Sequence, residues 1–312
     1  MTTTRFIGAA EMAGPERLVR VVDALAEVFA DLAAGRTRSP SRTVVEHGEE
    51  CQLLAGTAVW ERRGVGSVKI TTLTPDNPGR GLPLIHGVVV LTDLQTGEIT
   101  ALLDGAELTA VRTGAVAGLA TRLCAPEDAS ELALIGAGVQ ARALVRAVSA
   151  VRPIRSVRVY SRTAASAAAF GEWVRDEFGH EVTVCPTAKA AVADAAIVCT
   201  ATSTNGRMPL VEADWVTPGA HVNVIGGTNE QAVELDPTLL AAAFVVVEDR
   251  EVAVEDAGEI RIALADGRIK VADLTELGAL VGGFEPDGRT TVFRGVGMAI
   301  EDTAAAAALV DQ

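Results

Sequence analysis

A glycine-rich turn is the clearest candidate for chemistry in this sequence. The apolar run 132–135 leads directly into Gly136-Ala137-Gly138-Val139-Gln140-Ala141, and a helical pattern follows. In a strand–turn–helix context a GxGxxA motif is typical of dinucleotide binding, because its glycines permit a tight turn and close approach to the pyrophosphate at a helix N-terminus. Glycine-rich turns also occur for structural reasons alone. In this context we expect cofactor contacts from Gly136, Ala137, Gly138, Val139 and Gln140.

The end of the next strand-like run indicates which nicotinamide cofactor is bound. An NAD site usually has Asp or Glu there to hold the ribose 2′-hydroxyl. This chain has Ser161-Arg162-Thr163 and no acid at that place. Arg162 could form charge-assisted hydrogen bonds with a 2′-phosphate, flanked by the two hydroxyls; the alternative is a solvated surface arginine. The pattern favours NADP(H), with NAD(H) possible.

A later strand-like run ends in hydroxyl side chains, in the segment Thr200-Ala201-Thr202-Ser203. The carboxyl ends of parallel strands face the ligand crevice of an open sheet. We therefore expect these residues to contact the cofactor, and the alternative is helix or turn capping.

Three cations outside the glycine-rich half could bind an anion. Lys69 lies mid-strand between apolar neighbours, where a lysine usually faces solvent. Arg112 lies in an apolar helical stretch of small residues and needs a partner, because burying a lone charge is expensive. Arg42 follows Pro40-Ser41 and is unremarkable by itself.

Hydrophobic spacing predicts the elements that position these residues. Helical spacing runs through 15–34, 106–125 and 297–310, while 43–103 reads as a sheet dominated by hairpins, with QTGE at 95–98 as a turn. From residue 131 strands and helices alternate, with added strands near 221–227 and 244–249. This βαβαβ rhythm predicts a parallel sheet with helices on both faces. The expected class is α/β: a Rossmann domain plus an α+β domain with a mostly antiparallel sheet.

Composition excludes several classes of function. The 312 residues carry a formal net charge of −14, so no basic footprint for nucleic acid exists and anionic membranes are disfavoured. The length suggests about two domains. The four cysteines form no CxxC pair or zinc-ligand spacing, which predicts a reducing cytoplasm and no metal site. We find no signal peptide and no apolar run long enough to span a membrane.

Taken together, these residues resemble the ornithine cyclodeaminase/μ-crystallin family along nearly the full chain. The matching stretches are GSVK (66–69), PDNP (75–78), GLP (81–83), ALLDG (101–105), LTAVRT (108–113), LIGAGVQ (134–140), GE (258–259) and GMAIED (297–302).

The resemblance implies a division of labour along the chain. Residues 1–118, completed by the C-terminal helix 296–312, would bind the substrate and form a homodimer, and 119–295 would form the Rossmann NADP(H)-binding domain. It further implies that Lys69 and Arg112, with Arg42, hold an amino-acid carboxylate. Thr113, Gly226 and Gly295 complete the expected cofactor contacts.

Two departures from the family pattern bear on the reaction. Cyclodeaminases carry an aspartate after the glycine pair matched to Gly226-Gly227, where this chain has Thr228, followed by Asn229. They also carry a glutamate matched to Gln52. Gln52, Thr228 and Asn229 are therefore expected to line the substrate site, but an amide or hydroxyl is no general base near neutral pH.

The expected function is therefore an NADP(H)-dependent oxidoreductase acting at the carbon–nitrogen centre of an amino or imino acid, such as a ketimine. Lys69 and Arg112 are its expected catalytic residues: Arg112 would clamp the carboxylate, and Lys69 would bind it or relay a proton. Two alternatives remain. One is an ornithine-cyclodeaminase-like enzyme, which would release ammonia without net cofactor turnover. The other is a non-catalytic, NADPH-dependent ligand-binding protein like μ-crystallin.

Overall fold

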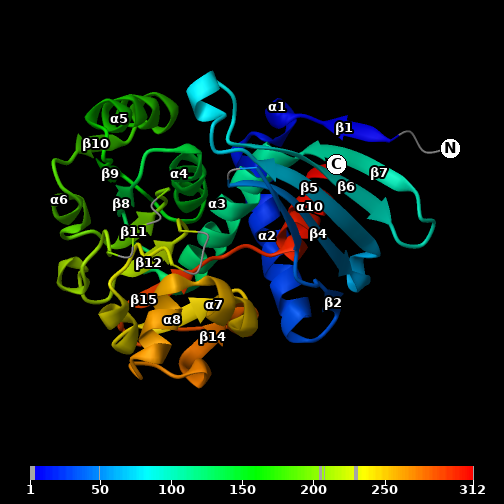
Figure 1. The fold of residues 1–312 in the computed structure, drawn as a ribbon. Helices are drawn as coiled ribbons and strands as arrows, with labels where there is room; N and C mark the ends of the chain where they lie inside the picture. The colour runs from blue at the N-terminus through cyan, green and yellow to red at the C-terminus, as the bar shows by residue number, and fades with distance from the viewer. Residues whose placement is uncertain (1–3, 49, 204–205, 207, 228–230, 312) are drawn as a thin grey trace. The chain divides into compact units, whose positions relative to one another are not determined.

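A computed structural model describes residues 4–48, 50–203, 206, 208–227 and 231–311 (Figure 1). The chain divides into two compact units. Residues 1–112 and 297–312 form the unit called N-terminal here, and residues 113–296 form the central unit. The functional boundaries predicted at 118/119 and 295/296 stay predictions.

The N-terminal unit is built on a seven-stranded sheet with the order β1-β7-β6-β5-β4-β2, in which β3 also pairs with β4. The strands are β1 (Arg5–Ile7), β2 (Thr37–Arg38), β3 (Thr43–His47), β4 (Cys51–Trp60), β5 (Val65–Leu73), β6 (Ile85–Asp93) and β7 (Ile99–Asp104). All pairings are antiparallel except that of β1 with β7. The predicted QTGE hairpin joins β6 to β7, where Asp93 Oδ1 accepts hydrogen bonds from the backbone of Gln95 and Thr96.

Helices cover one face of this sheet. They are α1 (Ala9–Met12), α2 (Pro15–Ala33) and, from the other end of the chain, α10 (Ala299–Val310). The apolar positions of α2 that recur at helical spacing are buried, as amphipathic packing requires. Helix α10 packs against α2, β4 and β5, as the red and blue ribbons of Figure 1 show. Ser67 and Thr303 join β5 to α10 through a 2.7 Å hydrogen bond between their hydroxyls.

The central unit contains an eight-stranded sheet in which every pairing is parallel. Its strands are β8 (Glu131–Ile135), β9 (Ser156–Tyr160), β10 (Glu181–Val184), β11 (Ile197–Thr200), β12 (His221–Val224), β13 (Phe244–Val247), β14 (Leu274–Glu276) and β15 (Thr291–Arg294). The strand order is β10-β9-β8-β11-β12-β15-β13-β14. The chain therefore builds outward from β8 on one side and then returns to place β11 on the other, which makes the β8/β11 border the topological switch point.

Helices connect these strands. They are α4 (Val139–Val151), α5 (Ala164–Phe178), α6 (Ala188–Val192), α7 (Arg250–Asp256), α8 (Gly258–Ala265) and α9 (Leu277–Leu280), and α3 (Gly105–Cys124) belongs to both units. Short 3₁₀ helices lie at Glu61–Arg63, Pro78–Arg80, Ala213–Trp215, Pro237–Ala241 and Val271–Asp273. Gly114 lets α3 approach α4 closely, since a Cβ there would lie 2.6 Å from the carbonyl oxygen of Ala143. Among the described residues, no helix is both long and apolar enough to cross a membrane.

Candidate active site

Two cations and two carboxylates form a buried cluster in the N-terminal unit. Lys69 Nζ lies 2.7 Å from Asp302 Oδ2. Arg112 Nη1 donates to Glu301 Oε2 at 2.9 Å, and its Nε lies 3.3 Å from Asp302 Oδ1. Both carboxylate side chains are at most 1% exposed, whereas Lys69 and Arg112 retain 16% and 12%. The cations are therefore held in place by acids deeper in the unit while keeping a small accessible surface.

The register of β5 turns Lys69 toward the covered face of the sheet. Directly opposite residues of an antiparallel sheet share a face, and Lys69 pairs with Gly56 on β4 and Val89 on β6. Val89 is fully buried, and a Cβ on Gly56 would lie 3.3 Å from Ala299 of α10. Lys69 thus lies beneath α10. This excludes the alternative that Lys69, like most lysines in the middle of a strand, faces solvent.

The start of α10 positions the cluster's other members. Glu301 accepts a 2.8 Å hydrogen bond from the backbone N–H of Met298, which caps the helix, and its second oxygen binds Arg112. Gly297 has φ +83°, and a Cβ there would lie 2.8 Å from Arg112 Nη1. This position requires glycine twice over: for its left-handed backbone and for the space that the guanidinium occupies.

The surroundings of Lys69 lower the pKa of its ammonium group. Burial lowers the pKa of Lys69, and the nearby charge of Arg112 lowers it further, while Asp302 and Glu301 partly oppose the shift. A lysine with a lowered pKa releases its proton more readily near neutral pH than a solvated one. The ion pairs with Asp302 and Glu301 fix the orientation of both cations.

The other residues predicted to bind the substrate are not part of the Lys69–Arg112 cluster. Gln52 lies on β4 opposite Leu73 and shares the covered face of the sheet with Lys69. Arg42 is exposed in the segment between β2 and β3. Thr228 and Asn229 lie outside the described residues. The described chain therefore brings together Lys69 and Arg112, with Gln52 on the same face.

The glycine-rich turn of the central unit has the geometry of an anion cradle. Gly136 has φ +116°, and a Cβ there would overlap the carbonyl oxygen of Ala201, so only glycine fits. Among the described residues other than its chain neighbours, none has an atom within 4 Å of the Cβ position of Gly138, so the turn is open where a phosphate would approach. Helix α4 begins at the next residue, and its first N–H groups have no partners within the helix.

Ala141 and Gln140 also fit a nucleotide at this turn. Ala141 is fully buried, and its small side chain permits close packing of α4 against the sheet. Among the described atoms, Gln140 Oε1 is buried and has no hydrogen-bond partner, which suits a site that a ligand completes. Ala137 lies between the two glycines, and Val139 is 67% exposed at the helix start.

The residues expected near the ribose follow β9 directly. Ser161 is half-buried, while Arg162 and Thr163 are exposed, and Thr163 is the N-cap residue of α5. Arg162 takes part in no ion pair within the described part of the chain. An exposed guanidinium in the turn after the second strand is available to a 2′-phosphate.

The remaining predicted cofactor residues lie at strand ends or in α3. Thr200 ends β11, and Ala201, Thr202 and Ser203 follow it, while Thr113 is buried in α3. Gly226 follows β12 and Gly295 follows β15, so both lie at the carboxyl edge of the same parallel sheet.

Sequence reasoning missed the acids that organise both groups of residues. Glu301 and Asp302 are adjacent acids in an otherwise apolar, alanine-rich helix, and Glu234 is fully buried beside Thr200 and Thr202. The sequence offered a signal for Glu301 and Asp302. An acid in an apolar helix needs a cationic partner, just as Arg112 in its apolar helix needs an acidic one. No spacing rule would single out Glu234.

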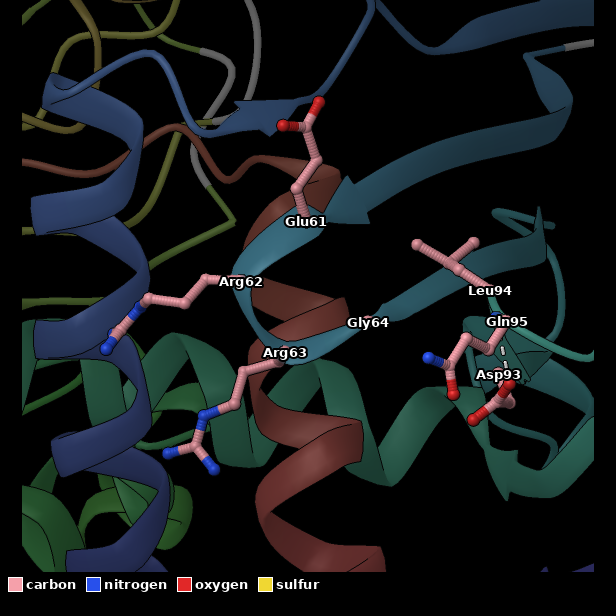
Figure 2. A pocket seen from close by; sticks show the side chains of 7 residues that line it. All are labelled: Glu61, Arg62, Arg63, Gly64, Asp93, Leu94 and Gln95. Carbon is pink, nitrogen blue, oxygen red and sulfur yellow. Dashed lines mark hydrogen bonds between the residues drawn. The ribbon is translucent and has the colours of Figure 1, made fainter.

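A surface depression of about 540 Å³ lies elsewhere in the N-terminal unit, at the β4–β5 and β6–β7 turns. Figure 2 shows Arg62 and Arg63 pointing toward α2. Arg62 binds Asp31 at 2.6 Å and Arg63 binds Glu27 at 2.7 Å. Asp93 accepts hydrogen bonds from its own turn. The charges that line this depression are occupied by structural contacts, and it is not the candidate site.

The chain is similar in sequence and in fold to known oxidoreductases. Over 303 residues the chain is 35% identical to a Δ1-pyrroline-2-carboxylate reductase of Bacillus cereus, covering 95% of this chain and 92% of the relative. The structure of the Thermococcus litoralis Δ1-pyrroline-2-carboxylate reductase in complex with NADH and L-proline superposes with a TM-score of 0.91 at 30% identity, covering 99% of this chain and 97% of the other.

An archaeal alanine dehydrogenase dimer with bound NAD superposes with a TM-score of 0.88 at 29% identity, covering 99% of this chain and 95% of the other. These names fit the predicted chemistry at a carbon–nitrogen centre. The model of the ornithine cyclodeaminase/mu-crystallin family matches residues 4–312. The predicted resemblance is confirmed, and the chain belongs to the ornithine cyclodeaminase/mu-crystallin family.

Proposed function

We propose that this protein is an NAD(P)H-dependent reductase of the carbon–nitrogen double bond of α-imino acids, with cyclic ketimines as the preferred class. The observation that carries the proposal is the Lys69–Arg112 pair, which Asp302 and Glu301 hold in a buried cluster. A Δ1-pyrroline-2-carboxylate is a cyclic imino acid whose reduction yields proline, the amino acid in the structure of the Thermococcus relative.

Arg112 supplies the substrate clamp in this proposal. A guanidinium presents a planar set of donors that matches a carboxylate, and its contacts with Glu301 and Asp302 fix the orientation of that plane. The carboxylate lies one bond from the reacting carbon of an α-imino acid. Holding it therefore places the C=N bond against the cluster.

Lys69 supplies the proton. Reduction of C=N adds a hydride to the carbon and a proton to the nitrogen, so a donor must lie near the nitrogen. Lys69 Nζ carries protons, is held by Asp302 and has a pKa lowered by burial, which suits a donor working near neutral pH. After donating, Lys69 is neutral beside Asp302 and takes a proton back from solvent.

The dinucleotide would be held by the central unit, at the Gly136–Gly138 turn, the N-terminus of α4 and the strand ends at Thr200–Thr202 and Gly226. When bound, the reduced nicotinamide supplies the hydride. The exposed Arg162 and the lack of an acid after β9 support a preference for NADP(H). NAD(H) is the alternative, since solved relatives hold NADH or NAD.

The proposed assembly is a homodimer formed through the uncovered face of the N-terminal sheet. Large apolar side chains are exposed on that face: Phe6 (65%), Val45 (52%), Ile70 (43%) and Leu53 (41%). Large apolar side chains exposed on one face of a sheet are a feature of interaction sites, and the archaeal relative is a dimer. A second copy of this chain is the proposed occupant. Location in the cytoplasm stays a prediction from the cysteines, which are all unpaired.

A substrate screen tests the proposal. NADPH and NADH oxidation is followed with cyclic imino acids, and separately with 2-oxo acids plus ammonia or alkylamines. We expect the fastest oxidation with a five- or six-membered cyclic α-imino acid, and faster with NADPH than with NADH. Oxidation with none of these substrates, although nucleotide binds, would favour the non-catalytic ligand-binding alternative.

A further inference from the structure

Glu234 is a fully buried carboxylate in the central unit that accepts hydrogen bonds from the ends of two neighbouring strands. Thr200 Oγ1 donates to Oε2 at 2.6 Å, and the backbone N–H of Gly226 donates to the same oxygen at 2.8 Å. The backbone N–H and the hydroxyl of Thr202 donate to Oε1 at 2.7 and 2.5 Å. One side chain thus joins the loop after β11 to the loop after β12.

These two loops lie at the switch point of the parallel sheet. Strand β11 pairs with β8, which leads into the glycine-rich turn, and with β12 on its other side. Ala201 lies between the two threonines that Glu234 binds, and its carbonyl oxygen is the atom that a Cβ on Gly136 would overlap. The position of Ala201 relative to Gly136 is therefore set by the contacts of Glu234 on both sides of Ala201, together with the 2.9 Å hydrogen bond that the Ala201 N–H donates to the carbonyl oxygen of Ile135.

Glu234 is itself fixed by a second buried ion pair. Its backbone N–H donates to Glu259 Oε1 at 2.7 Å, and Glu259 Oε2 lies 2.9 Å from Arg294 Nε. The Arg294 guanidinium then donates to the backbone carbonyl oxygens of Val224, Gly227 and Gly295. The network ties the carboxyl ends of β12 and β15 to the residue that holds the end of β11.

The donors around Glu234 suit the ionised carboxylate. Burial raises its pKa, and the hydrogen bonds from Thr200 and Thr202 and the charge of Arg294 oppose that shift. A carboxylate is an acceptor only, and the two backbone N–H groups that face it can only donate. A Cβ on Gly226 would overlap the same carboxylate, so Gly226 is required for this contact as well as for the backbone path.

We infer that Glu234 is a positioning residue for the dinucleotide, whose carboxylate holds the loops after β11 and β12 at the distance from the glycine-rich turn that the cofactor needs. This inference rests on the proposed function, because the crevice at the switch point must take a dinucleotide. In this inference Glu234 binds the two loops and acts on the dinucleotide only through them, without contacting the dinucleotide itself.

The test compares cofactor affinity with stability in an amide-for-carboxylate variant. Glu234→Gln keeps the shape, but in either orientation of the amide its NH₂ group faces the backbone N–H of Thr202 or of Gly226, so one of the two loops loses its contact. We expect the Kd for NADPH and for NADH, measured by nicotinamide fluorescence well below the melting temperature, to rise about 10- to 100-fold. At saturating cofactor, kcat should stay within about threefold of wild type, since the reacting groups are unchanged.

Asp31→Asn is the matched control. Asp31 is a buried carboxylate of the N-terminal unit that accepts hydrogen bonds from Trp60, Arg36 and Arg62. The Asp31→Asn variant should have a lowered melting temperature, as Glu234→Gln should, but unchanged Kd values for NADPH and NADH. An equal rise of Kd in both variants would make the effect a general loss of stability and overturn the inference.

A milder pair of variants decides the question if Glu234→Gln does not fold. Thr200→Val removes one donor and keeps the shape, and Glu234→Asp shortens the side chain by one carbon. Each should raise the Kd about 3- to 10-fold, the effect of a single lost hydrogen bond. Wild-type affinity in both would overturn the inference and leave the proposed function standing. A wild-type protein that binds neither NADPH nor NADH would overturn both.

Discussion

Lys69 and Arg112 are each held by a carboxylate, and this determines how their variants should behave. Arg112 contacts Glu301 and Asp302, which are almost fully buried, so removing its charge leaves two acids short of a partner. Breaking such a buried pair costs about 3–5 kcal/mol of folding stability. A drop in melting temperature in Arg112→Ala therefore does not separate a structural from a catalytic role, and a variant that keeps the charge is needed.

Arg112→Lys is that variant. A lysine keeps the charge but cannot bind a carboxylate through two parallel hydrogen bonds. We expect kcat/KM for the imino acid to fall about 30- to 1000-fold, which corresponds to about 2–4 kcal/mol of transition-state binding. Steady-state kinetics and a thermal melt of the same preparation provide the check. Near-wild-type kinetics with a large fall in melting temperature would mean that Arg112 serves only the fold.

The role of Lys69 as proton donor predicts a pH profile. If protonated Lys69 is required, kcat falls as pH rises through its pKa, which burial places below the ordinary value of 10.5. Asp302 opposes that shift, so Asp302→Asn should move the alkaline fall in kcat to lower pH. Profiles of kcat at saturating substrate compare the two proteins. An alkaline limb that stays in place would exclude Lys69 as the titrating donor.

At the residue scale, the sequence predicted the cations better than their partners. Arg112 was expected to need a partner because of its apolar helix, but Glu301 lies 189 residues away, and spacing carries no information about such a contact. Strand alternation alone favoured a solvated Lys69, and only the family resemblance placed it in the site. The covered face of β5 is set by α10, which comes from the opposite end of the chain.

The start of α10 is the element on which the cluster depends most. It carries Glu301 and Asp302 in its first turn, and Gly297 just before it leaves room for the Arg112 guanidinium. The position of this helix start thus fixes the acids and the cation together. Small changes there should act on substrate binding without touching the substrate directly.

Gly297→Ala tests this dependence. A side chain at φ +83° is strained, and its Cβ would also displace Arg112. Gly288 has the same φ, and no described residue beyond its chain neighbours has an atom within 4 Å of its Cβ position, so Gly288→Ala introduces the backbone strain alone. Gly288→Ala should lose about 1–2 kcal/mol of stability, and Gly297→Ala should lose more, because it also displaces the Arg112 guanidinium. Only Gly297→Ala should raise the KM for the imino acid, by about tenfold; equal KM values in the two variants would contradict the role of Gly297.

The long helices and strands were predicted from the sequence, whereas several short strands were missed. Helix α3 spans 105–124 against the predicted 106–125, and the sheet strands from 43 to 103 formed where apolar runs predicted them. Strands β1, β14 and β15 were missed. They have only three or four residues and are defined by pairing with neighbouring strands. The equally short strands β12 and β13 were predicted because each lies in an apolar run such as FVVV.

At the scale of the whole molecule, the uncovered face of the N-terminal sheet predicts self-association. The alternation of strands and helices along the chain predicted the parallel sheet of the central unit. This was possible because each helix there connects strands that are close in the sequence. The closure of the N-terminal unit by residues 297–312 is not local, and periodicity alone could not predict it. With α10 on one face, the sheet's other face keeps its apolar side chains exposed.

A charge on that face should prevent formation of the proposed dimer. Ile70→Asp places a carboxylate amid the proposed interface, and Val184→Asp is the control, since Val184 on β10 is similarly exposed (40% against 43%). Sedimentation equilibrium at micromolar concentration should give a dimer for the wild type and for Val184→Asp. Ile70→Asp should be largely monomeric. A wild-type monomer, or a dimeric Ile70→Asp variant, would contradict an interface on this face.

The most direct test of the central claim follows a labelled hydrogen atom. The protein is incubated with a cyclic α-imino acid and NADPH carrying deuterium at the transferable C4 position, and the product is examined by mass spectrometry and NMR. Reduction of the C=N bond by NADPH should give one oxidised NADPH for each amino acid formed and deuterium on Cα. The Arg112→Lys variant should give little product at equal protein concentration. Ammonia release from ornithine without net NADPH oxidation, and no label in any product, would contradict it and identify a cyclodeaminase instead.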